Sequence, residues 1–381
     1  MSLENIGKYI EEFSRKNKNN EPYPVYSVTN SNGFCTDYFN KDVSGQDKTT
    51  YKIVPRGYFA YNPSRINVGS IDWQNIDDNV IVSPLYVVFK CSNNLDQDYL
   101  KYFLKSPEGI RLINEKAIGS VRNNLKFKEL SEFKLNIVDV KEQRNIVSKL
   151  KLIESAIENE KNQIKLYDEL IKARFVEMFG DLEENPMNWD KTPLSNVIIH
   201  ANNGMARRGN DEGGNIVMRL VELQDGFIDY TNPNRINLND SEKKRYLLKD
   251  GDFLFARVNG NPNNVGRCAV FYDIGEDVYH NDHIIRVHFN DELLDGIYAS
   301  TLFNSDYVKK QLKSKIKTSA GQYTISQDGI GAIVAIIPPM DMQKFFASFV
   351  KQVDKSKVVA KQRLKLFEEL LQKKTYDYYI G

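Results

Sequence analysis

Apolar side chains recur along two stretches of the chain at alternating intervals of four and three residues, with one interruption in each. The first series is Ile146, Leu150, Ile153, Ile157, Ile164, Tyr167 and Ile171, and the second is Phe346, Val350, Val353, Ala360, Leu364, Phe367 and Leu371. This spacing is typical of the seam along which two long helices pack. Neither stretch contains Pro or Gly before Gly180 and Gly381, so each is predicted to form one straight helix.

A charged residue interrupts each series, Glu160 in the first and Lys357 in the second. Opposite charges at these positions fit two helices that pack against each other in an antiparallel coiled coil. The alternative, in which each helix packs only against its own domain, stays open at this point.

The chain is internally repeated. The segment QIKLYDEL at 163–170 matches RLKLFEEL at 363–370 in residue class at nearly every position. Further towards the N-terminus, VPRGYFAY at 54–61 aligns with LKDGDFLF at 248–255, at a smaller offset. A drifting offset indicates loop insertions on a common scaffold, so each half of the chain is predicted to be one copy of the same unit.

The part of each copy that precedes its long helix has a different pattern. Short apolar runs such as VSPLYVVF at 82–89 and HIIRVHF at 283–289 are separated by Gly, Asn and Pro, which predicts small sheets with long loops. A short helix is expected after each, at 98–106 and at 296–305. The fold class is therefore α+β, and the turn-rich segment 180–189 is predicted to link the two copies.

The overall charge does not decide what the chain binds. Lys plus Arg total 52 and Asp plus Glu total 51, a net charge of +1 that excludes a polybasic tail but permits a local basic face. With 41% hydrophobic and 27% charged residues, the composition is that of a folded protein. Cys35, Cys91 and Cys268 are odd in number and far apart, which favours buried thiols in a reducing compartment.

Neither export nor a membrane location is expected. Glu4, Lys8 and Glu11 lie where a signal peptide needs an uninterrupted apolar stretch. The longest apolar run ends at Pro338 and is far shorter than the ~20 residues that a membrane-spanning helix needs. We therefore expect a cytoplasmic protein.

Motifs for catalysis are not recognisable in the sequence. An adenine methyltransferase needs an Asn or Asp followed by two prolines and an aromatic residue, whereas NPSR at 62–65 lacks the second proline and the aromatic residue. We also find no phosphate-binding GxxxxGK[ST] loop. His280, His283 and His288 lie near Asp282, but surface or core histidines are the favoured interpretation, and no metal site is predicted.

Cationic and amide side chains occupy the loops at matching places in both copies. In the first copy they are Arg56, Asn62, Arg65, Asn67, Arg122, Asn123 and Lys126; in the second they are Arg207, Arg208, Arg257, Asn259, Asn263, Arg267, Lys315, Lys317 and Gln322, with Tyr323 beside them. Arg and Lys pair with guanine edges, Asn and Gln match adenine, and further cations neutralise phosphates. A single charged loop is usually only solvated, but the duplication makes these loops candidates for reading DNA.

Two motifs each precede a long helix: GSVRNNLKFKEL…IVDVKEQ at 119–143 and TSAGQYTISQDGI…IIPPMDMQ at 318–343. With the repeat, they make the whole chain resemble the specificity subunit of Type I restriction-modification systems. The resemblance implies two globular target-recognition domains, at 1–138 and 187–336. They would be joined by two antiparallel helices with pseudo-twofold symmetry, in a central conserved region with its linker at 139–186 and a distal one at 337–381.

The match to the family pattern is uneven. In the family a Pro-Leu-Pro-Pro-like run precedes Glu-Gln at the start of the helix. The second copy keeps Pro338 and Pro339, whereas the first has Val138 and Asp139. This departure concerns the geometry at the start of the first helix.

The resemblance also implies a function. The chain would be a non-catalytic subunit in which each domain reads one half of a bipartite target on double-stranded DNA, and the helices would fix the gap. Its partners would be two modification subunits, which hold S-adenosylmethionine, and restriction subunits; no cofactor is expected in this chain. Candidate docking residues outside the seam are Leu152, Phe175, Phe179, Phe345 and Phe349, for which burial against the domains is an equal alternative.

Two other functions fit parts of the sequence. A coiled-coil adaptor that displays two protein-binding domains explains the repeat and the seam equally well, but it does not need Arg, Asn and Gln at matched places in the loops. A solitary restriction enzyme would require catalytic motifs that we do not find in this chain.

Overall fold

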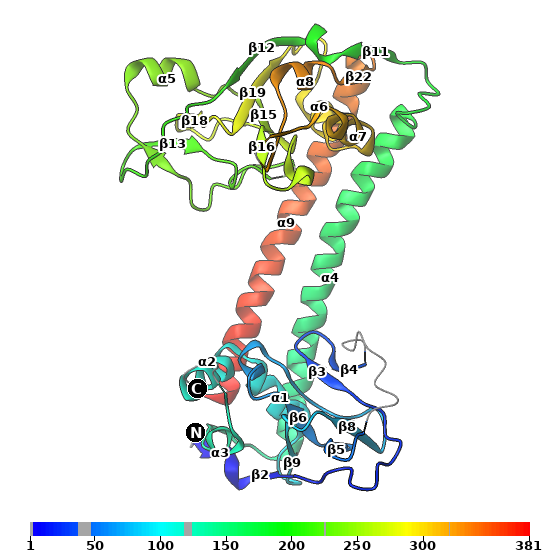
Figure 1. The fold of residues 1–381 in the computed structure, drawn as a ribbon, viewed down its shortest axis with the longest axis vertical. Coiled ribbons are helices and arrows are strands. Elements are labelled where there is room, and N and C mark those ends of the chain that lie inside the picture. Colours follow the sequence, from blue (N-terminus) through cyan, green and yellow to red (C-terminus); the bar gives the residue numbers. More distant parts are fainter. Residues whose placement is uncertain (1–2, 37–46, 118–123, 225, 320) are drawn as a thin grey trace. The chain divides into compact units, whose positions relative to one another are not determined.

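The computed structural model describes residues 3–36, 47–117, 124–224, 226–319 and 321–381 (Figure 1). These residues form two compact units. Unit 1 comprises Met1–Gln163 and Ala360–Gly381, and unit 2 comprises Ile164–Val359. Among the described residues, no helix is both long and apolar enough to cross a membrane.

Unit 1 is built on a four-stranded antiparallel sheet. Its order is β2 (Ile10–Glu12), β9 (Val87–Cys91), β6 (Phe59–Tyr61) and β7 (Ile71–Trp73). Three two-stranded pairs surround it: β1 (Leu3–Asn5) with β10 (Lys134–Asn136), β3 (Ser27–Thr29) with β4 (Gly33–Cys35), and β5 (Lys52–Pro55) with β8 (Asn79–Val82). The helices are α1 (Gln97–Lys105), α2 (Pro107–Lys116) and α3 (Phe127–Ser131), with short 3-10 turns at Ile6–Lys8 and Ile66–Val68.

Unit 2 repeats this topology. Its antiparallel sheet has the order β12 (Ile198–Asn203), β19 (Ile284–Phe289), β15 (Phe253–Ala256) and β17 (Cys268–Val270). The helices α6 (Gly296–Phe303), α7 (Asp306–Lys315) and α8 (Gln327–Gly331) take the places of α1, α2 and α3, and β11 (Asp190–Pro193) pairs with β22 (Val334–Ile337) as β1 does with β10. The repeat predicted from the sequence is therefore confirmed.

Unit 2 differs from unit 1 beside this sheet. One further sheet has the order β14 (Arg235–Ile236), β13 (Asn215–Met218) and β18 (Val278–His280), in which β18 takes the place of β8. A second has the order β16 (Val258–Asn259), β21 (Gln322–Thr324) and β20 (Lys317–Ser319). The 3-10 turns at Leu194–Asn196 and Pro262–Asn264 take the places of those at Ile6–Lys8 and Ile66–Val68. Helix α5 (Asp240–Tyr246) and the strands β14, β16, β20 and β21 have no counterpart among the described residues of unit 1. They fit the loop insertions that the drifting offset predicts.

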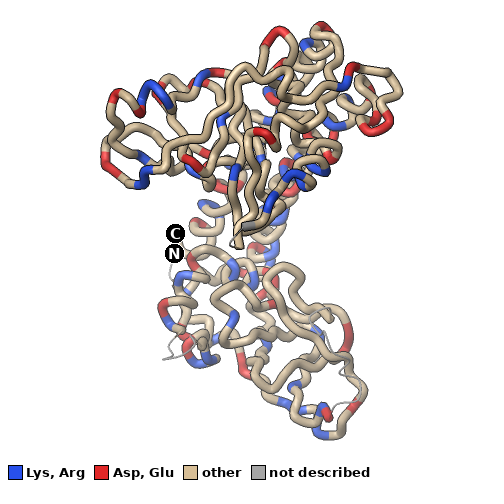
Figure 2. Tube along the Cα trace, turned by 45° about the horizontal axis from the view of Figure 1, so that its top comes forward, with Lys and Arg blue, Asp and Glu red and all other residues tan. Residues whose placement is uncertain are grey.

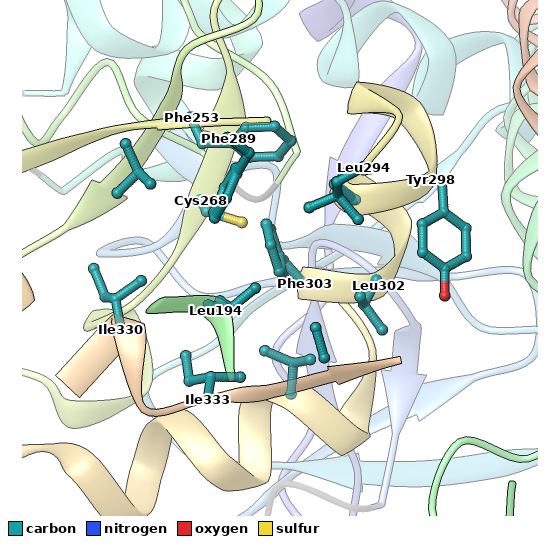
Figure 3. Close-up of a cluster of buried hydrophobic side chains, with 14 of the residues drawn as sticks. Leu194, Phe253, Cys268, Phe289, Leu294, Tyr298, Leu302, Phe303, Ile330 and Ile333 are labelled. Carbon is teal, nitrogen blue, oxygen red and sulfur yellow. The ribbon is translucent and has the colours of Figure 1, made fainter. Parts of the chain in front are cut away.

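An apolar core supports the sheet of each unit. In unit 2, Phe303 of α6 packs its ring against Phe253 and Phe289 of the sheet, with ring centroids 5.3 and 5.4 Å apart (Figure 3). Leu194, Ile330 and Ile333 close the other side of this core, and all six side chains are buried. Burying a side chain of this size stabilises the folded state by about 1.5–3 kcal/mol. The core therefore fixes the sheet from which the loops extend.

The two long helices are α4 (Val140–Phe179) and α9 (Met340–Tyr379), each uninterrupted (Figure 1). The first copy lacks the prolines of the second, yet its helix begins at the equivalent residue. The Oδ1 atom of Asp139 accepts a hydrogen bond from the Glu142 backbone at 3.0 Å, which caps the helix and replaces the proline run. Gly180 ends α4 with a φ of 75°, a left-handed conformation that favours glycine.

Within each unit, the parts of α4 and α9 that belong to it pack antiparallel. In unit 1, Arg363 lies 3.1 Å from Glu160, and the Asn136 amide donates to the carbonyl of Tyr378 at 3.2 Å. In unit 2, Lys357 pairs with Asp168, and the ring of Phe175 lies 5.4 Å from that of Phe346. The charged interruptions of the seam therefore face other partners on the opposite helix and do not pair with each other.

The seam positions are buried or half-buried in the structure. Those buried are Ile146, Leu150, Ile157, Phe346, Val350, Val353 and Ala360; those half-buried are Ile153, Ile164, Tyr167, Ile171, Leu364, Phe367 and Leu371.

The five docking candidates outside the seam differ in exposure. Phe175 and Phe179 pack against Tyr298 of α6 and are buried, which is the alternative to a docking role that the sequence left open. Leu152 and Phe345 are exposed, and Phe349 is half-buried.

Candidate functional site

In unit 1, the loop after β6 lies against the segment that precedes α3. The Ser64 hydroxyl donates to Oδ1 of Asn124 at 2.5 Å, and the Leu125 backbone donates to the carbonyl of Pro63 at 3.2 Å. These contacts bring together the predicted residues Asn62, Arg65, Asn67 and Lys126. Arg65 and Lys126 are exposed and form no ion pair with any residue that the structure describes. Arg122 and Asn123 lie outside the described residues.

Arg56 has a different place and is already engaged. It precedes β6, whereas the loop of Arg65 follows that strand. The Arg56 guanidinium donates to the carbonyls of Asn75 and Ile76 at 2.9 and 3.1 Å. This side chain holds the turn between β7 and β8, a role that its position in the sequence did not indicate.

In unit 2, the corresponding loop begins after β15 and continues into β16. The Ile325 backbone donates to the carbonyl of Arg257 at 2.9 Å, as Leu125 does to Pro63 in unit 1. Strand β16 pairs with β21, so Asn259 lies opposite Tyr323, and Thr318 of β20 pairs with Tyr323 from the other side. This three-stranded ribbon, made of β16, β21 and β20, gathers the predicted residues Asn259, Lys317, Gln322 and Tyr323 next to Arg257.

Arg208 follows β12 in the sequence, and its side chain contacts the turn between β18 and β19. Its Nη2 atom is 2.7 Å from Oδ1 of Asp282 and 3.1 Å from Nε2 of His283, and its Nη1 donates to the carbonyl of Ala206 at 2.8 Å. The Nη1 of Arg257 donates to the carbonyl of the same Asp282 at 2.8 Å. The structure therefore brings Arg208 and Arg257 together through Asp282, whose place among histidines in the sequence indicated at most a metal ligand.

The other predicted residues of unit 2 lie apart from this turn. Arg207 pairs with Glu242 at 2.9 Å, a residue in the first turn of α5. Arg267 donates to Oδ1 of Asn264 at 2.9 Å and to Oε1 of Gln224 at 3.3 Å, at the base of the loop after β16. Asn263 is exposed in that loop, and Lys315 is exposed in the last turn of α7.

The three histidines near Asp282 in the sequence have separate partners. His280 is buried, and the carbonyl of Tyr246 lies 3.1 Å from its Nδ1; burial lowers the pKa of His280 to about 4. His288 lies 3.0 Å from Asp252, and His283 contacts Arg208. Within the described ranges, no group of three His, Cys, Asp or Glu side chains is placed to hold a metal ion.

The charges of both units are mixed. Figure 2 shows Lys and Arg interspersed with Asp and Glu along each unit. Sequence-independent attraction to phosphates grows with the number of phosphates neutralised, so these mixed surfaces favour recognition by a few placed side chains over attraction by a broad basic face.

Comparison with known proteins identifies relatives over most of the chain. The family model for the Type I restriction modification DNA specificity domain matches residues 3–166 and 211–368. The specificity subunit of the Type I restriction enzyme StySPI from Salmonella potsdam is 26% identical over 273 residues, which are 68% of this chain and 58% of that protein. The specificity subunit of EcoKI from Escherichia coli K12 is 23% identical over 67% of this chain and 57% of its own length. The chain thus spans less than two thirds of the length of these relatives.

Two solved structures share the fold. A chain from a study of complex assembly and conformational transition of the type I R-M system has a TM-score of 0.62 at 14% identity, with coverage of 98% of this chain and 96% of that chain. The S subunit of a Type-I restriction-modification system from M. genitalium has a TM-score of 0.56 at 15% identity, covering 100% and 96%.

Proposed function

Since this chain belongs to the Type I restriction modification DNA specificity family, whose model matches it twice, we propose that it is the subunit that selects the DNA sequence for a Type I restriction-modification complex. The chain itself would be non-catalytic. Its relatives named above are specificity subunits, in keeping with that role. A DNA ligand also agrees with the cytoplasmic location expected from the sequence.

The observation that carries this proposal is the duplication of the loop assemblies on one scaffold. In each unit, the loop after a central strand is bonded to the segment before the small helix, through Pro63 and Leu125 in unit 1 and Arg257 and Ile325 in unit 2. The side chains on the two assemblies differ, with Arg65 and Lys126 on one and Arg257, Asn259 and Gln322 on the other. Two unlike assemblies read two unlike half-sites.

The helices α4 and α9 would set the gap between the half-sites. Each is 40 residues long and runs from one unit into the other. At ~1.5 Å per residue, such a helix is about 60 Å long. Protein geometry fixes half-site spacing in other DNA-binding proteins, and we propose the same role for the length of this helix pair.

The chain would recruit its catalytic partners through surfaces that folding leaves uncovered. We propose that two modification subunits, which would hold S-adenosylmethionine and methylate adenine, dock on the long helices, and that restriction subunits join them. Leu152 on α4 and Phe345 on α9 are 71% and 59% exposed. Contiguous exposed apolar patches mark partner surfaces in many proteins, and we propose these two side chains as the candidates for such contact.

The test is to express the chain with its modification subunit in a host that lacks other adenine methylation, and to sequence the methylated bases. We expect methyladenine in one bipartite motif with a constant gap. The double variant Arg65→Ala/Lys126→Ala in unit 1 should alter one half of that motif only. A complex that assembles but leaves the DNA without a bipartite motif would contradict the proposal.

A second measurement distinguishes DNA recognition from the adaptor hypothesis, in which the two domains bind proteins. Binding of the complex to a duplex should weaken linearly in log affinity against log salt, because cationic side chains release counterions from phosphates. An adaptor whose domains bind proteins would show no such fall with duplex DNA.

A further inference from the structure

The turn 281–283 between β18 and β19 is held by two other segments of unit 2. The Asp282 backbone donates to the carbonyl of Met205 at 2.9 Å, and the Met205 backbone donates to the carbonyl of His280 at 3.0 Å. From the other side, the Arg257 backbone donates to the carbonyl of His283 at 2.7 Å. Residues far apart in the sequence are thereby fixed around one turn.

Gly204 allows the first of these segments to approach so closely. A Cβ atom at this position would lie 2.2 Å from the carbonyl oxygen of Asn281 and 2.3 Å from that of His280. No other residue type fits there without moving the backbone. The segment that carries Arg208 therefore lies directly against the turn.

The two arginines at this turn use their nitrogens differently. Both terminal nitrogens of Arg208 have protein partners: Ala206 for Nη1, and Asp282 and His283 for Nη2. Arg208 cannot present these two nitrogens to a base without breaking contacts, so its geometry is that of a support.

Arg257 presents the complementary arrangement. Its Nη1 donates to the carbonyl of Asp282, whereas its Nε and Nη2 have no hydrogen-bond partner among the residues that the structure describes. Nε and Nη2 form one edge of the planar guanidinium, and two parallel donors of this kind match O6 and N7 of guanine. The side chain is half-buried, and one of its nitrogens is already bound within the protein. The side chain therefore loses less conformational entropy when it binds a base.

The neighbouring ribbon adds polar side chains of the right kind. Arg257 directly precedes β16, and Gln322 is exposed on β21, next to Tyr323, the partner of Asn259. A β-ribbon fits the major groove, and Gln matches adenine there. Arg257 thus lies at the end of a ribbon that can carry it to base edges.

We propose that Arg257 reads a guanine in the half-site of unit 2 and that Asp282 is its positioning residue, because Asp282 binds Arg257 through its carbonyl and Arg208 through its carboxylate. This inference rests on the proposed function and assigns separate roles to residues of that site. Arg208 and Asp282 act through Arg257 and do not themselves contact the base.

The experiment uses the full chain with its modification subunit and measures the methylated motif, together with binding to a library of random-sequence duplexes. Arg257→Ala should reduce the preference for guanine at one position of one half-site by roughly 5- to 150-fold, the range for loss of a bidentate contact. Asp282→Ala and Arg208→Ala should reduce the same preference at the same position, by a smaller factor. Asp282→Asn keeps an oxygen that accepts from Arg208, so this variant should retain more of the guanine preference than Asp282→Ala does.

Two features separate positioning from general damage. The double variant Arg208→Ala/Asp282→Ala should lose no more preference than either single variant, because both remove one support. Arg235→Ala is the matched control, since Arg235 pairs with Glu276 at 2.6 Å in the same unit, away from the turn. The Arg208–Asp282 pair is partly exposed and exposed pairs add little to stability, so these variants should fold. Damage to folding would lower methylation everywhere without changing the preferred base.

Each alternative outcome has a distinct meaning. If Arg257→Ala removes the preference while Asp282→Ala and Arg208→Ala leave it intact, the positioning role is wrong. If Arg257→Ala changes neither half-site although the wild type reads a bipartite motif, guanine is read elsewhere and the whole inference is overturned. If the wild type has no bipartite motif, the proposed function fails as well.

Discussion

Gln143 and Gln343 make the same three hydrogen bonds, each in its own unit. The Oε1 of Gln143 accepts from the Asp96 backbone at 2.8 Å, and its Nε2 donates to the carbonyls of Asn94 and Val138 at 2.8 and 2.7 Å. The equivalent partners of Gln343 are Asp295, Leu293 and Pro338, at 2.9, 3.0 and 2.8 Å. Both side chains are fully buried. Each glutamine thereby ties the first turn of a long helix to the start of α1 or α6.

Replacing either glutamine should destabilise its own unit alone. Gln143→Ala leaves one backbone N–H and two carbonyls without this partner, and each unsatisfied buried group costs about 1–3 kcal/mol. We expect a loss on the order of 3 kcal/mol in unit 1, and the same in unit 2 for Gln343→Ala. Trp73 lies in unit 1 and Trp189 in unit 2, so single-tryptophan variants report each unit separately in urea.

The control for this pair is Gln352→Ala, at an exposed position on α9. It should leave both transitions within about 0.5 kcal/mol, as surface substitutions do. Equal losses in both units after Gln143→Ala would show that the bonds do not act locally.

Tyr379, near the end of α9, should be essential for unit 1. Its ring packs 4.5 Å from Tyr99 and 5.6 Å from Phe103, and its hydroxyl donates to the carbonyl of Tyr99 at 2.8 Å. Tyr379→Ala should cost roughly 3–5 kcal/mol, as large core truncations do, and Tyr379→Phe about 1 kcal/mol. Urea unfolding followed by Trp73 measures both. Tyr376→Ala removes an exposed ring from the same turn and should have a much smaller effect.

Acid should weaken unit 2 through His280. Burial lowers the pKa of this imidazole to about 4 from its ordinary value of 6.5. Between these values the unfolded chain binds a proton that the folded one does not, so stability is present above the unfolded pKa and is lost as the pH falls towards 4. The shift corresponds to about 3 kcal/mol, and His280→Asn should remove this part of the pH dependence.

The internal control for the histidine is unit 1. All four histidines of the chain, His200, His280, His283 and His288, belong to unit 2. The Trp73 transition should therefore keep its pH profile in the His280→Asn variant. An unchanged profile for Trp189 in that variant would show that His280 does not cause the acid sensitivity.

Shortening both long helices together should shorten the gap in the DNA motif. Residues 158–164 and 358–364 face each other around the Glu160–Arg363 ion pair. Deleting both segments removes one heptad, preserves the apolar seam and shortens each helix by ~10 Å. At 3.4 Å per base pair, the gap should fall by about three base pairs while both half-site sequences stay the same. Methylome sequencing that finds an unchanged gap, or a changed half-site sequence, would contradict the proposal that the length of α4 and α9 sets the gap.

Exposed apolar residues of the helices should matter for assembly and not for folding. Leu152→Glu and Phe345→Glu should lower the amount of modification subunit that co-purifies with the chain, because a charge would be buried in the proposed interface. Leu85→Glu is the control, since Leu85 is 75% exposed in a loop of unit 1. Equal loss for all three variants would argue against these two sites.

The periodic parts of the chain were predictable. A seam with a fixed period, and two copies with matched segments, depend on local patterns, and these indicated both 40-residue helices. The glutamines Gln143 and Gln343 stood at the ends of two aligned motifs, so a signal for their shared role was present. Their bonds to Asn94 and Leu293 are distant in sequence, however, and only the fold reveals them.

The individual site residues were less predictable, for a physical reason. An arginine in a loop can bind DNA or a carbonyl of its own chain, and the choice depends on which distant loop lies beside it. Arg56 binds the turn at Asn75, and Arg208 binds Asp282. The sequence could not decide between exposure and burial for Phe175 and Phe179, because only the fold places α6 against these positions outside the seam. Asp282 carried no signal beyond its neighbouring histidines.

The two units differ in how they can form during synthesis. Unit 2 is one continuous segment, whereas unit 1 needs Ala360–Gly381, which are translated nearly two hundred residues after its first part. Domains generally fold as they leave the ribosome. Unit 2 can therefore fold on the nascent chain. Unit 1 can complete its fold only after α9 is made, because Tyr99 and Phe103 pack against Tyr379. A message truncated just after the codon for Val359 would release a product in which unit 2 is complete and unit 1 is not.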